Sequence, residues 1–249
     1  MEEKVSLLVV ENVSKSFGGN RVLKGVSFSL GEGEIIGIVG PNGSGKTTLL
    51  NILSGTVRQD EGGVFFKGKR VDHLSPHRRA KMGIGRTFQI TRLFTNLTVL
   101  ENVLIPLHYG SPGPSGKKAE EILDMVGLLR MKDLKAGSLS LAQRKRLELA
   151  RALSLNPKLL LLDEVFAGLN PVSIREILDL LRRIHSETGV AMVLVEHVLK
   201  ALFQITRRVI VLSEGRIIYE GKPEGMAKNQ EVIKAYLGER YGAFRGKGP

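Results

Sequence analysis

The sequence predicts an α/β fold, and three features carry that prediction. A glycine-rich segment at residues 40–48 lies between an apolar run of strand length, residues 35–39, and a run that can continue a helix. Four leucines at residues 159–162 have the pattern of a buried strand and end in two carboxylates. Residues 93–155 have mostly helical spacing and no obvious core strand. We therefore expect an α/β core with a helical segment inserted into it.

The glycine-rich segment matches the phosphate-loop template G-x-x-x-x-G-K-[ST] at every fixed position. Glycines let the backbone turn so that successive N–H groups point at a phosphate, and a helix starting near Lys46 adds the positive end of its dipole. Lys46 is expected to reach the β- and γ-phosphates, and the Thr47 hydroxyl to bind Mg²⁺. The candidate nucleotide-binding residues are Gly40, Pro41, Asn42, Gly43, Ser44, Gly45, Lys46, Thr47 and Thr48. The alternative for this segment is a glycine-rich turn that binds nothing.

The composition limits the class of protein. The 249 residues are enough for one large domain or two small ones, and the 42% of hydrophobic residues allow a buried core. The absence of cysteine excludes disulfides and thiolate metal sites. No signal peptide is visible, and apolar runs such as residues 190–195 are far shorter than the about 20 residues that span a bilayer. We expect a soluble chain or one that contacts a membrane peripherally.

The net charge of +12 is concentrated in two stretches. Residues 58–92 carry nine Lys/Arg and three Asp/Glu, a net charge of +6, and residues 130–151 carry seven Lys/Arg and two Asp/Glu, a net charge of +5. Such stretches can contact nucleic acid, anionic lipid or an acidic partner. They can equally form a solvated face that balances a bound triphosphate, so the charge alone leaves the partner open.

The N-terminal third is expected to consist mainly of strands. Residues 7–13 and 22–30 have strand patterns and are separated by a turn signal at residues 17–20. Phe17 in this turn could stack on an adenine ring, although a lone phenylalanine more often lies in a core. The segments that follow are short strand pieces at 62–71, a basic helix at 75–81 and a strand at 84–89 that ends in Gln89.

The middle of the chain is expected to be helical. Helical spacing covers residues 93–107 and 118–129, and Ser140 can cap a further helical run at residues 144–155. The expected division of a single domain, residues 1–249, is a core with a β subdomain, residues 1–92 and 156–249, and a helical subdomain, residues 93–155.

Two carboxylates follow the leucine strand at the end where open α/β sheets bind ligands. Asp163 suits an oxygen-preferring Mg²⁺, and Glu164 can accept a proton from an attacking water or hold that water in line. The alternative is that this acidic pair only begins a helix. His197 follows another buried strand, residues 191–195, at a comparable place after its strand. A helix at 171–187, a hairpin at 209–219 and helical residues from 223 complete the pattern.

In their order and approximate spacing, these motifs resemble the ATPase subunit of ATP-binding-cassette (ABC) transporters over essentially the whole chain. The resemblance rests on the phosphate loop, Gln89, the segment 139–143, the strand that ends in Asp163-Glu164, and His197. Finer features are similar to the branch that imports branched-chain amino acids. They are Thr87-Phe88-Gln89, Ala167-Gly168-Leu169-Asn170-Pro171, Glu196-His197 and Ala235-Tyr236-Leu237-Gly238-Glu239.

The resemblance implies a phosphate-loop NTPase core with an N-terminal antiparallel β subdomain and an inserted α-helical subdomain. It implies that two subunits pair head to tail around two ATP molecules, with Mg²⁺, beneath integral membrane subunits at the cytoplasmic face of the cell membrane. Nucleic acid is not expected as a partner. The implied roles are catalysis for Lys46, Gln89, Glu164 and His197, metal binding for Thr47, Gln89 and Asp163, adenine stacking for Phe17, and contact with the partner's ATP for Ser140 and Gln143.

Two departures from the family pattern stand out. Leu141 and Ala142 replace both glycines of the usual L-S-G-G-Q signature, and Val165 stands where proline usually follows the glutamate. Other interpretations remain open: an exporter or lipid-extraction ATPase, a soluble ABC protein that acts on nucleic acid, and an ordinary phosphate-loop kinase. The kinase leaves the segment 139–143 unexplained, and no part of the sequence names a transported substrate.

Overall fold

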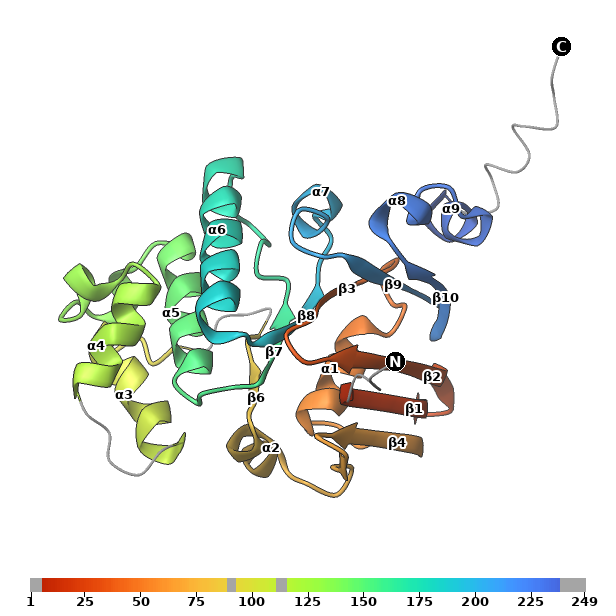
Figure 1. Cartoon of the computed structure of the whole chain (residues 1–249), viewed down its shortest axis with the longest axis horizontal. Coiled ribbons are helices and arrows are strands. Elements are labelled where there is room, and N and C mark those ends of the chain that lie inside the picture. The colour runs from red at the N-terminus through yellow and green to blue at the C-terminus, as the bar shows by residue number, and fades with distance from the viewer. Residues whose placement is uncertain (1–5, 89–92, 111–115, 238–249) are drawn as a thin grey trace, which may run out of the picture. The chain divides into compact units, whose positions relative to one another are not determined.

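The computed structural model describes residues 6–88, 93–110 and 116–237, which form two compact units (Figure 1). Of the described residues, the first unit takes in 6–31, 35–73 and 194–237, and the second takes in 32–34, 74–88, 93–110 and 116–193. Within the described ranges, no helix has the length and apolar character needed to cross a membrane.

The first unit contains an antiparallel sheet built from the N-terminal strands that the sequence predicts. Its strands lie in the order β2-β1-β4-β5. Their bounds are β1 Ser6–Phe17, β2 Asn20–Gly31, β4 Glu61–Phe66 and β5 Lys69–Arg70. Buried and exposed side chains alternate along the second half of β2, because one face of this strand packs against apolar neighbours. The antiparallel β subdomain is thus present.

The first unit also positions the phosphate loop. Strand β3 (Ile35–Val39) runs parallel to β9 (Arg208–Ser213), which continues through a tight turn into antiparallel β10 (Arg216–Gly221). The glycine-rich segment connects β3 to helix α1 (Lys46–Ser54). Three short helices complete the unit: α7 Leu199–Leu202, α8 Pro223–Met226 and α9 Gln230–Leu237.

The second unit combines parallel strands with helices. Strand β6 (Ile84–Arg86) pairs in parallel with β7 (Leu159–Asp163), and β8 (Ala191–Val195) follows β7 in the strand order. All five residues of β7 are buried, as its run of leucines predicts. The helices are α2 Pro76–Met82, α3 Val99–Gly110, α4 Gly116–Met125, α5 Leu141–Leu153 and α6 Pro171–Thr188. Helices α3, α4 and α5 pack against one another (Figure 1).

Helix α3 begins later than the sequence pattern predicts, at Val99 rather than at residue 93. Thr98 and Glu101 form a reciprocal cap: the Thr98 N–H donates to Glu101 Oε2 at 2.7 Å, and the Glu101 N–H donates to Thr98 Oγ1 at 3.1 Å. The fully buried Asn102 donates from Nδ2 to the carbonyl oxygens of Phe94 and Thr98, which keeps residues 94–98 out of the helix. The T-x-x-E spacing could have located this start.

Other element ends also differ from the sequence prediction: β1 continues to Phe17 rather than residue 13, and α5 spans Leu141–Leu153 rather than residues 144–155. Strand β6 ends at Arg86; after it, the Thr87 N–H donates to the Leu161 oxygen of β7, and the Thr87 hydroxyl oxygen rather than a carbonyl group accepts from the Asp163 N–H. Helix α4 ends at Met125, ahead of Gly127, whose φ of 70° is unfavourable in a helix. Gln89 lies outside the described residues, as do the loop residues 111–115.

Candidate nucleotide-binding site

The phosphate loop needs glycine at two of its positions for geometric reasons. Gly40 and Gly45 have φ values of 154° and 104°, which residues with a side chain rarely adopt. A Cβ on Gly40 would lie 1.9 Å from the Leu212 carbonyl oxygen, and one on Gly45 would lie 2.7 Å from Leu23 Cδ2. These two glycines therefore let the loop pack directly against its neighbouring strands.

The same loop is fixed by backbone hydrogen bonds. The Ser44 N–H donates to the Pro41 oxygen at 3.2 Å, and the Gly215 N–H in the β9–β10 turn donates to the Ser44 oxygen at 3.2 Å. Gly45 caps α1 in the left-handed conformation and offers no side-chain cap, so the first N–H groups of α1 have no side-chain acceptor at the cap position. Thr47 is exposed and Thr48 is half-buried on the first turn.

Lys46 folds back over the loop from the first position of α1. Only 6% of its surface is exposed, and its Nζ donates to the carbonyl oxygens of Gly40 and Pro41, both at 2.9 Å. The Ser44 Oγ lies 3.4 Å from the same nitrogen. An ammonium group held against a glycine-rich loop, at the start of a helix, is an arrangement that favours phosphate binding.

Two other predicted residues of the first unit lie on its surface. Phe17, the last residue of β1, is 48% exposed, and Lys15 Nζ lies 5.3 Å from its ring centre. This exposure leaves a flat face for stacking and removes the alternative that Phe17 is a core residue. His197 is exposed directly after β8, whereas the preceding Glu196 is buried.

In the second unit, the acidic pair lies at the carboxyl end of β7, as predicted. Asp163 is 2% exposed, and its Oδ2 accepts from Arg86 Nη2 at 3.3 Å. Its Oδ1 is buried and has no hydrogen-bond partner among the described residues. Burial raises the pKa of Asp163, and the nearby Glu164 adds to the rise, while Arg86 and Lys145 oppose it. A buried carboxylate oxygen without a donor is suited to a cation, so Asp163 fits the metal role that the sequence suggests.

Ser140 caps helix α5, which confirms the N-cap prediction. The Ser140 N–H donates to Gln143 Oε1 at 2.8 Å, and the Gln143 N–H donates to Ser140 Oγ at 3.4 Å. Arg144 stabilises the residues that precede this cap: its Nε donates to the Leu139 oxygen at 2.8 Å, and its Nη2 donates to the Gly137 oxygen at 2.9 Å. The residues 139–143 therefore form an ordered helix start with an exposed serine.

The comparison with protein families decides which family these motifs represent. The family model described as "ABC transporter" matches residues 23–167, a segment that contains the phosphate loop, the α5 cap and the acidic pair. The chain belongs to the ABC transporter family. It is an ATPase with an α/β phosphate-loop NTPase fold, as the sequence predicts.

Relatives of this ABC ATPase have names from two transport systems. The branched-chain amino acid transport ATP-binding protein LivG (named as probable) of Archaeoglobus fulgidus is 40% identical over 248 residues, covering 94% of this chain and 96% of the relative. The lipopolysaccharide export system ATP-binding protein LptB of Haemophilus influenzae is 35% identical over 240 residues, covering 95% and 99%.

Solved structures agree with the fold of this ABC ATPase. A nucleotide-free ATP-binding cassette from an ABC transporter superposes with a TM-score of 0.86 at 33% identity, covering 94% of this chain and all of the other. A dimeric post-hydrolysis cassette bound to ADP and Pi gives 0.79 at 33% identity, covering 87% and 98%. The protein cbiO1 of Clostridium perfringens, described as part of the ABC transporter complex cbiONQ, gives 0.80 at 29% identity, covering 97% and 99%.

Leu141 and Val165, which depart from the family pattern in this ABC ATPase, differ in burial. Leu141 is exposed, and its Cδ2 lies 3.0 Å from the position that a Cβ on Gly168 would occupy. Leu141 thus packs against the backbone after the acidic pair, and any side chain at residue 168 would displace it. Val165 is buried in the second unit, so an apolar side chain suits this position.

Several site-building residues of this ABC ATPase were not anticipated from the sequence. The Thr87 hydroxyl oxygen accepts from the Asp163 N–H at 3.3 Å, and Glu148 Oε1 accepts from the Phe88 N–H at 2.7 Å. Burial raises the pKa of Glu148, while its bond from Phe88 and the charges of Lys145 and Arg151 lower it. The burial of Lys145 and Glu148 could have been inferred from the sequence, because these charged residues lie three positions apart in a helix whose other buried residues are mostly apolar.

The two basic stretches are not uniformly surface charge. Arg79 is 1% exposed, and its Nε donates to the Leu74 carbonyl oxygen at 3.2 Å. Lys145 is 3% exposed. Arg79 and Lys145 therefore do not contribute to a solvated face, whereas Arg78 and Lys81 are exposed.

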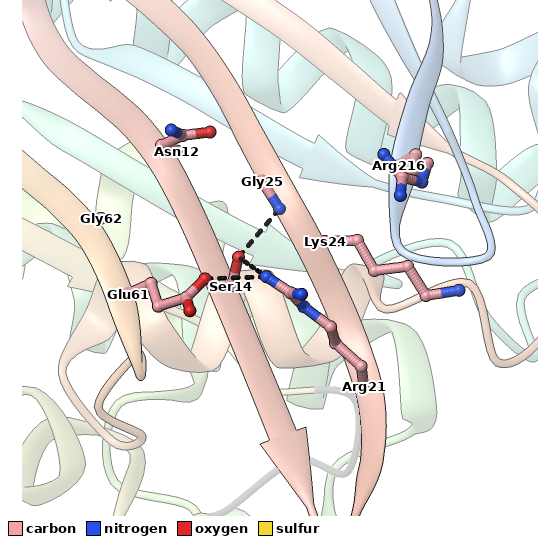
Figure 2. A pocket seen from close by; sticks show the side chains of 8 residues that line it. All are labelled: Asn12, Ser14, Arg21, Lys24, Gly25, Glu61, Gly62 and Arg216. Carbon is pink, nitrogen blue, oxygen red and sulfur yellow. Dashed lines mark hydrogen bonds and ion pairs between the residues drawn. The ribbon is translucent and has the colours of Figure 1, made fainter.

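A polar hollow of about 440 Å³ lies in the antiparallel sheet of the first unit (Figure 2). Arg21 on β2 reaches across the hollow, donating from Nη2 to Ser14 Oγ at 3.0 Å and to Glu61 Oε2 at 2.7 Å (Figure 2). The Gly25 N–H also donates to Ser14 Oγ, at 3.0 Å. These bonds join β1, β2 and β4, and no predicted site residue lines the hollow.

Proposed function

We propose that this ATPase powers an ABC importer of branched-chain amino acids or similar small solutes. The observation that carries this proposal is the 40% identity over 248 residues to the LivG relative of Archaeoglobus fulgidus; other relatives named LivG or BraF are 34% identical, close to the 35% of the LptB relative. The second candidate function is export or extraction of a lipid. The LptB relative supports it, because its similarity extends over 95% of this chain.

We propose that Lys46 and the N–H groups at the start of α1 hold the β- and γ-phosphates of ATP, and that the exposed Phe17 ring stacks on adenine. Glu164 would position the attacking water and accept its proton, and His197 would contact the γ-phosphate. Gln89, named here from the family pattern alone, would orient the metal or the water. The roles of Phe17, His197 and Gln89 are those that the family resemblance implies.

Thr47 and Asp163, with Gln89, would hold Mg²⁺. The exposed Thr47 hydroxyl and the buried Asp163 Oδ1, which lacks a donor among the described residues, provide suitable oxygen ligands. When bound, the ion neutralises charge on the β- and γ-phosphates.

The partner in hydrolysis would be a second ATPase subunit, either a copy of this chain or a close paralogue. Ser140 and Gln143 would approach the γ-phosphate held by the partner, because a helix start offers N–H groups to an anion. The dimeric relative bound to ADP and Pi supports the pairing of two ATPase subunits. Two-fold pairing would use the same surfaces twice.

The second class of partner would be integral membrane subunits, which would hold the chain at the cytoplasmic face of the membrane. The cbiO1 relative, which belongs to the cbiONQ complex, supports this assignment. The exposed basic residues Arg78 and Lys81 would contribute attraction to anionic lipid or to the membrane partner. We do not propose nucleic acid as a ligand.

Reconstituted transport tests the substrate. The chain is purified with the membrane subunits that bind it, placed in vesicles, and supplied with ATP and either labelled leucine or labelled lipopolysaccharide. We expect ATP-dependent movement of leucine that stops with Glu164→Gln, while Lys117→Met, an exposed control in α4, transports normally. Movement of lipid without movement of leucine would replace the importer proposal by the export candidate.

A further inference from the structure

Glu164 has a backbone conformation that is unfavourable for its residue type. Its φ is 50°, in the left-handed region that side chains other than those of glycine, asparagine and aspartate seldom adopt. Such conformations persist only where surrounding contacts hold them, and they concentrate at functional sites. The contacts that hold the Glu164 peptide are therefore part of what sets the direction of its side chain.

Two donors meet the Glu164 carbonyl oxygen. Lys145 Nζ donates to it at 3.1 Å, and the Ala167 N–H also donates at 3.1 Å. The Ala167 bond is local and closes a turn, whereas Lys145 lies 19 residues earlier, on helix α5. Because Lys145 is only 3% exposed, its ammonium has left water to make contacts of this kind.

We propose that Lys145 is a positioning residue for ATP hydrolysis, which holds the peptide of Glu164 so that its carboxylate points at the attacking water. This inference rests on the proposed role of Glu164. Rotation about φ swings the Cα–Cβ bond, so release of the carbonyl group lets the carboxylate leave the place where a base must be. Lys145 does not touch the reacting atoms and acts through the backbone of Glu164.

Lys145 also has a structural role that the test must separate from positioning. Its charge lowers the pKa of the buried carboxylates Glu148 and Asp163. A variant without this charge loses stability as well as a backbone contact. A positioning role predicts a change in kcat with little change in KM, whereas loss of folded protein lowers the number of sites and leaves kcat per site unchanged.

The experiment compares Lys145→Met, Lys145→Arg and the control Lys117→Met, with activity expressed per nucleotide-binding site titrated with a fluorescent ATP analogue. A misplaced catalytic group slows reactions by up to about 100-fold, so we expect kcat of Lys145→Met to fall about 10- to 100-fold with KM within about threefold. Lys145→Arg keeps a charged donor and should recover most of kcat. Lys145→Gln, which keeps a shorter neutral donor, replaces Lys145→Met if that variant does not fold.

A double variant decides whether the effect passes through Glu164. In the Glu164→Gln background, Lys145→Met should slow hydrolysis by less than about twofold, because residues that act as a unit are not additive. An undiminished loss in that background, or a normal kcat in both Lys145→Met and Lys145→Gln, would overturn the positioning role. If Glu164→Gln alone hydrolysed ATP at the parent rate, the failure would belong to the proposed role of Glu164 instead.

Discussion

Helices α1 and α5 both begin with a sequence predicted to meet phosphate, but their first turns differ. At α1 the cap is Gly45, which has no side chain and so offers no side-chain acceptor to the first N–H groups. At α5 the cap is Ser140, and Ser140 and Gln143 satisfy each other's N–H groups through their side chains. One helix start is open to an anion, and the other is closed by its own residues.

This difference suggests an order of events. The open start of α1, with Lys46 held above its loop, is ready to receive the phosphates in a single chain. At the start of α5, a phosphate can accept from the N–H groups only if it replaces or shares the side-chain acceptors of the cap. The weaker of the two capping hydrogen bonds is the 3.4 Å contact from the Gln143 N–H to Ser140 Oγ. We expect α1 to bind nucleotide first and α5 to join when a second chain arrives.

The largest expected effect is on the rate of ATP hydrolysis, and it comes from a substitution that alters neither the start of α1 nor the start of α5. Glu164→Gln should retain ATP binding but slow turnover by roughly 10²- to 10⁴-fold, the usual contribution of a positioned base. Light scattering should then detect a dimer with ATP and a monomer with ADP, because the γ-phosphate is what α5 would contact. A stable dimer in ADP would show that the chains meet through some other surface.

The second-largest expected effect is on dimerisation, and it tests the capped start of α5. Ser140→Arg, made in the Glu164→Gln background, should abolish the ATP-dependent dimer. Overpacking costs about 1–3 kcal/mol at each of two symmetry-related sites, so the dissociation constant of the dimer should rise by at least about 30-fold. Sedimentation with ATP measures this constant, and ATP affinity of the monomer is the internal control. An unchanged dimer would remove α5 from the interface.

The third expected effect is on ATP affinity, and it tests the start of α1, whose cap residue has no side chain. Lys46→Ala should weaken ATP binding about 10- to 100-fold, because a hydrogen bond to a charged group contributes about 1.5–3 kcal/mol. Ser140→Ala should leave the same monomer affinity unchanged, since α5 joins only on dimerisation. Equilibrium titration of both variants in dilute solution compares them. Equal weakening by the two substitutions would contradict the proposed order of events.

A smaller effect is expected on stability. Ser140→Ala removes the side-chain acceptor for the Gln143 N–H and should lower the free energy of unfolding by about 1 kcal/mol. Thr98→Ala is the matched comparison at α3, where the corresponding bond is shorter at 3.1 Å. Urea unfolding followed by circular dichroism measures both losses, and we expect the loss at Thr98 to be at least as large.

The smallest effect concerns a surface that belongs to neither helix start. Arg78→Glu and Lys81→Glu, made singly, should each lower transport more than basal ATPase, by about fivefold, because one basic residue contributes about 1 kcal/mol of attraction near an anionic surface. Arg79 is left unchanged in this test because it is buried. Equal loss of transport and ATPase would indicate misfolding, and tight salt-sensitive binding to duplex DNA or RNA would favour a nucleic-acid partner.

Much of the fold and of the candidate site follows from patterns that are local in the chain. The phosphate loop, the all-leucine strand before Asp163, and the serine cap of α5 each occupy fewer than ten consecutive residues in the sequence. Strand and helix periods, turn glycines and caps act over such short distances, so the sequence alone determines them. The same patterns predicted strands at residues 7–13 and 22–30, whereas the family resemblance implied their antiparallel pairing.

Other features depended on residues that the fold brings together from distant parts of the sequence. Arg79 and Lys145 read as surface charge, yet both are buried. Lys145 meets the carbonyl group of Glu164, 19 residues away, and Glu148 meets the Phe88 N–H, 60 residues away. Charged side chains can be buried only where packing supplies partners, and no local pattern encodes those partners. Glu164 could therefore be proposed as the catalytic carboxylate from the sequence alone, whereas its contact with Lys145 was decided by the tertiary structure.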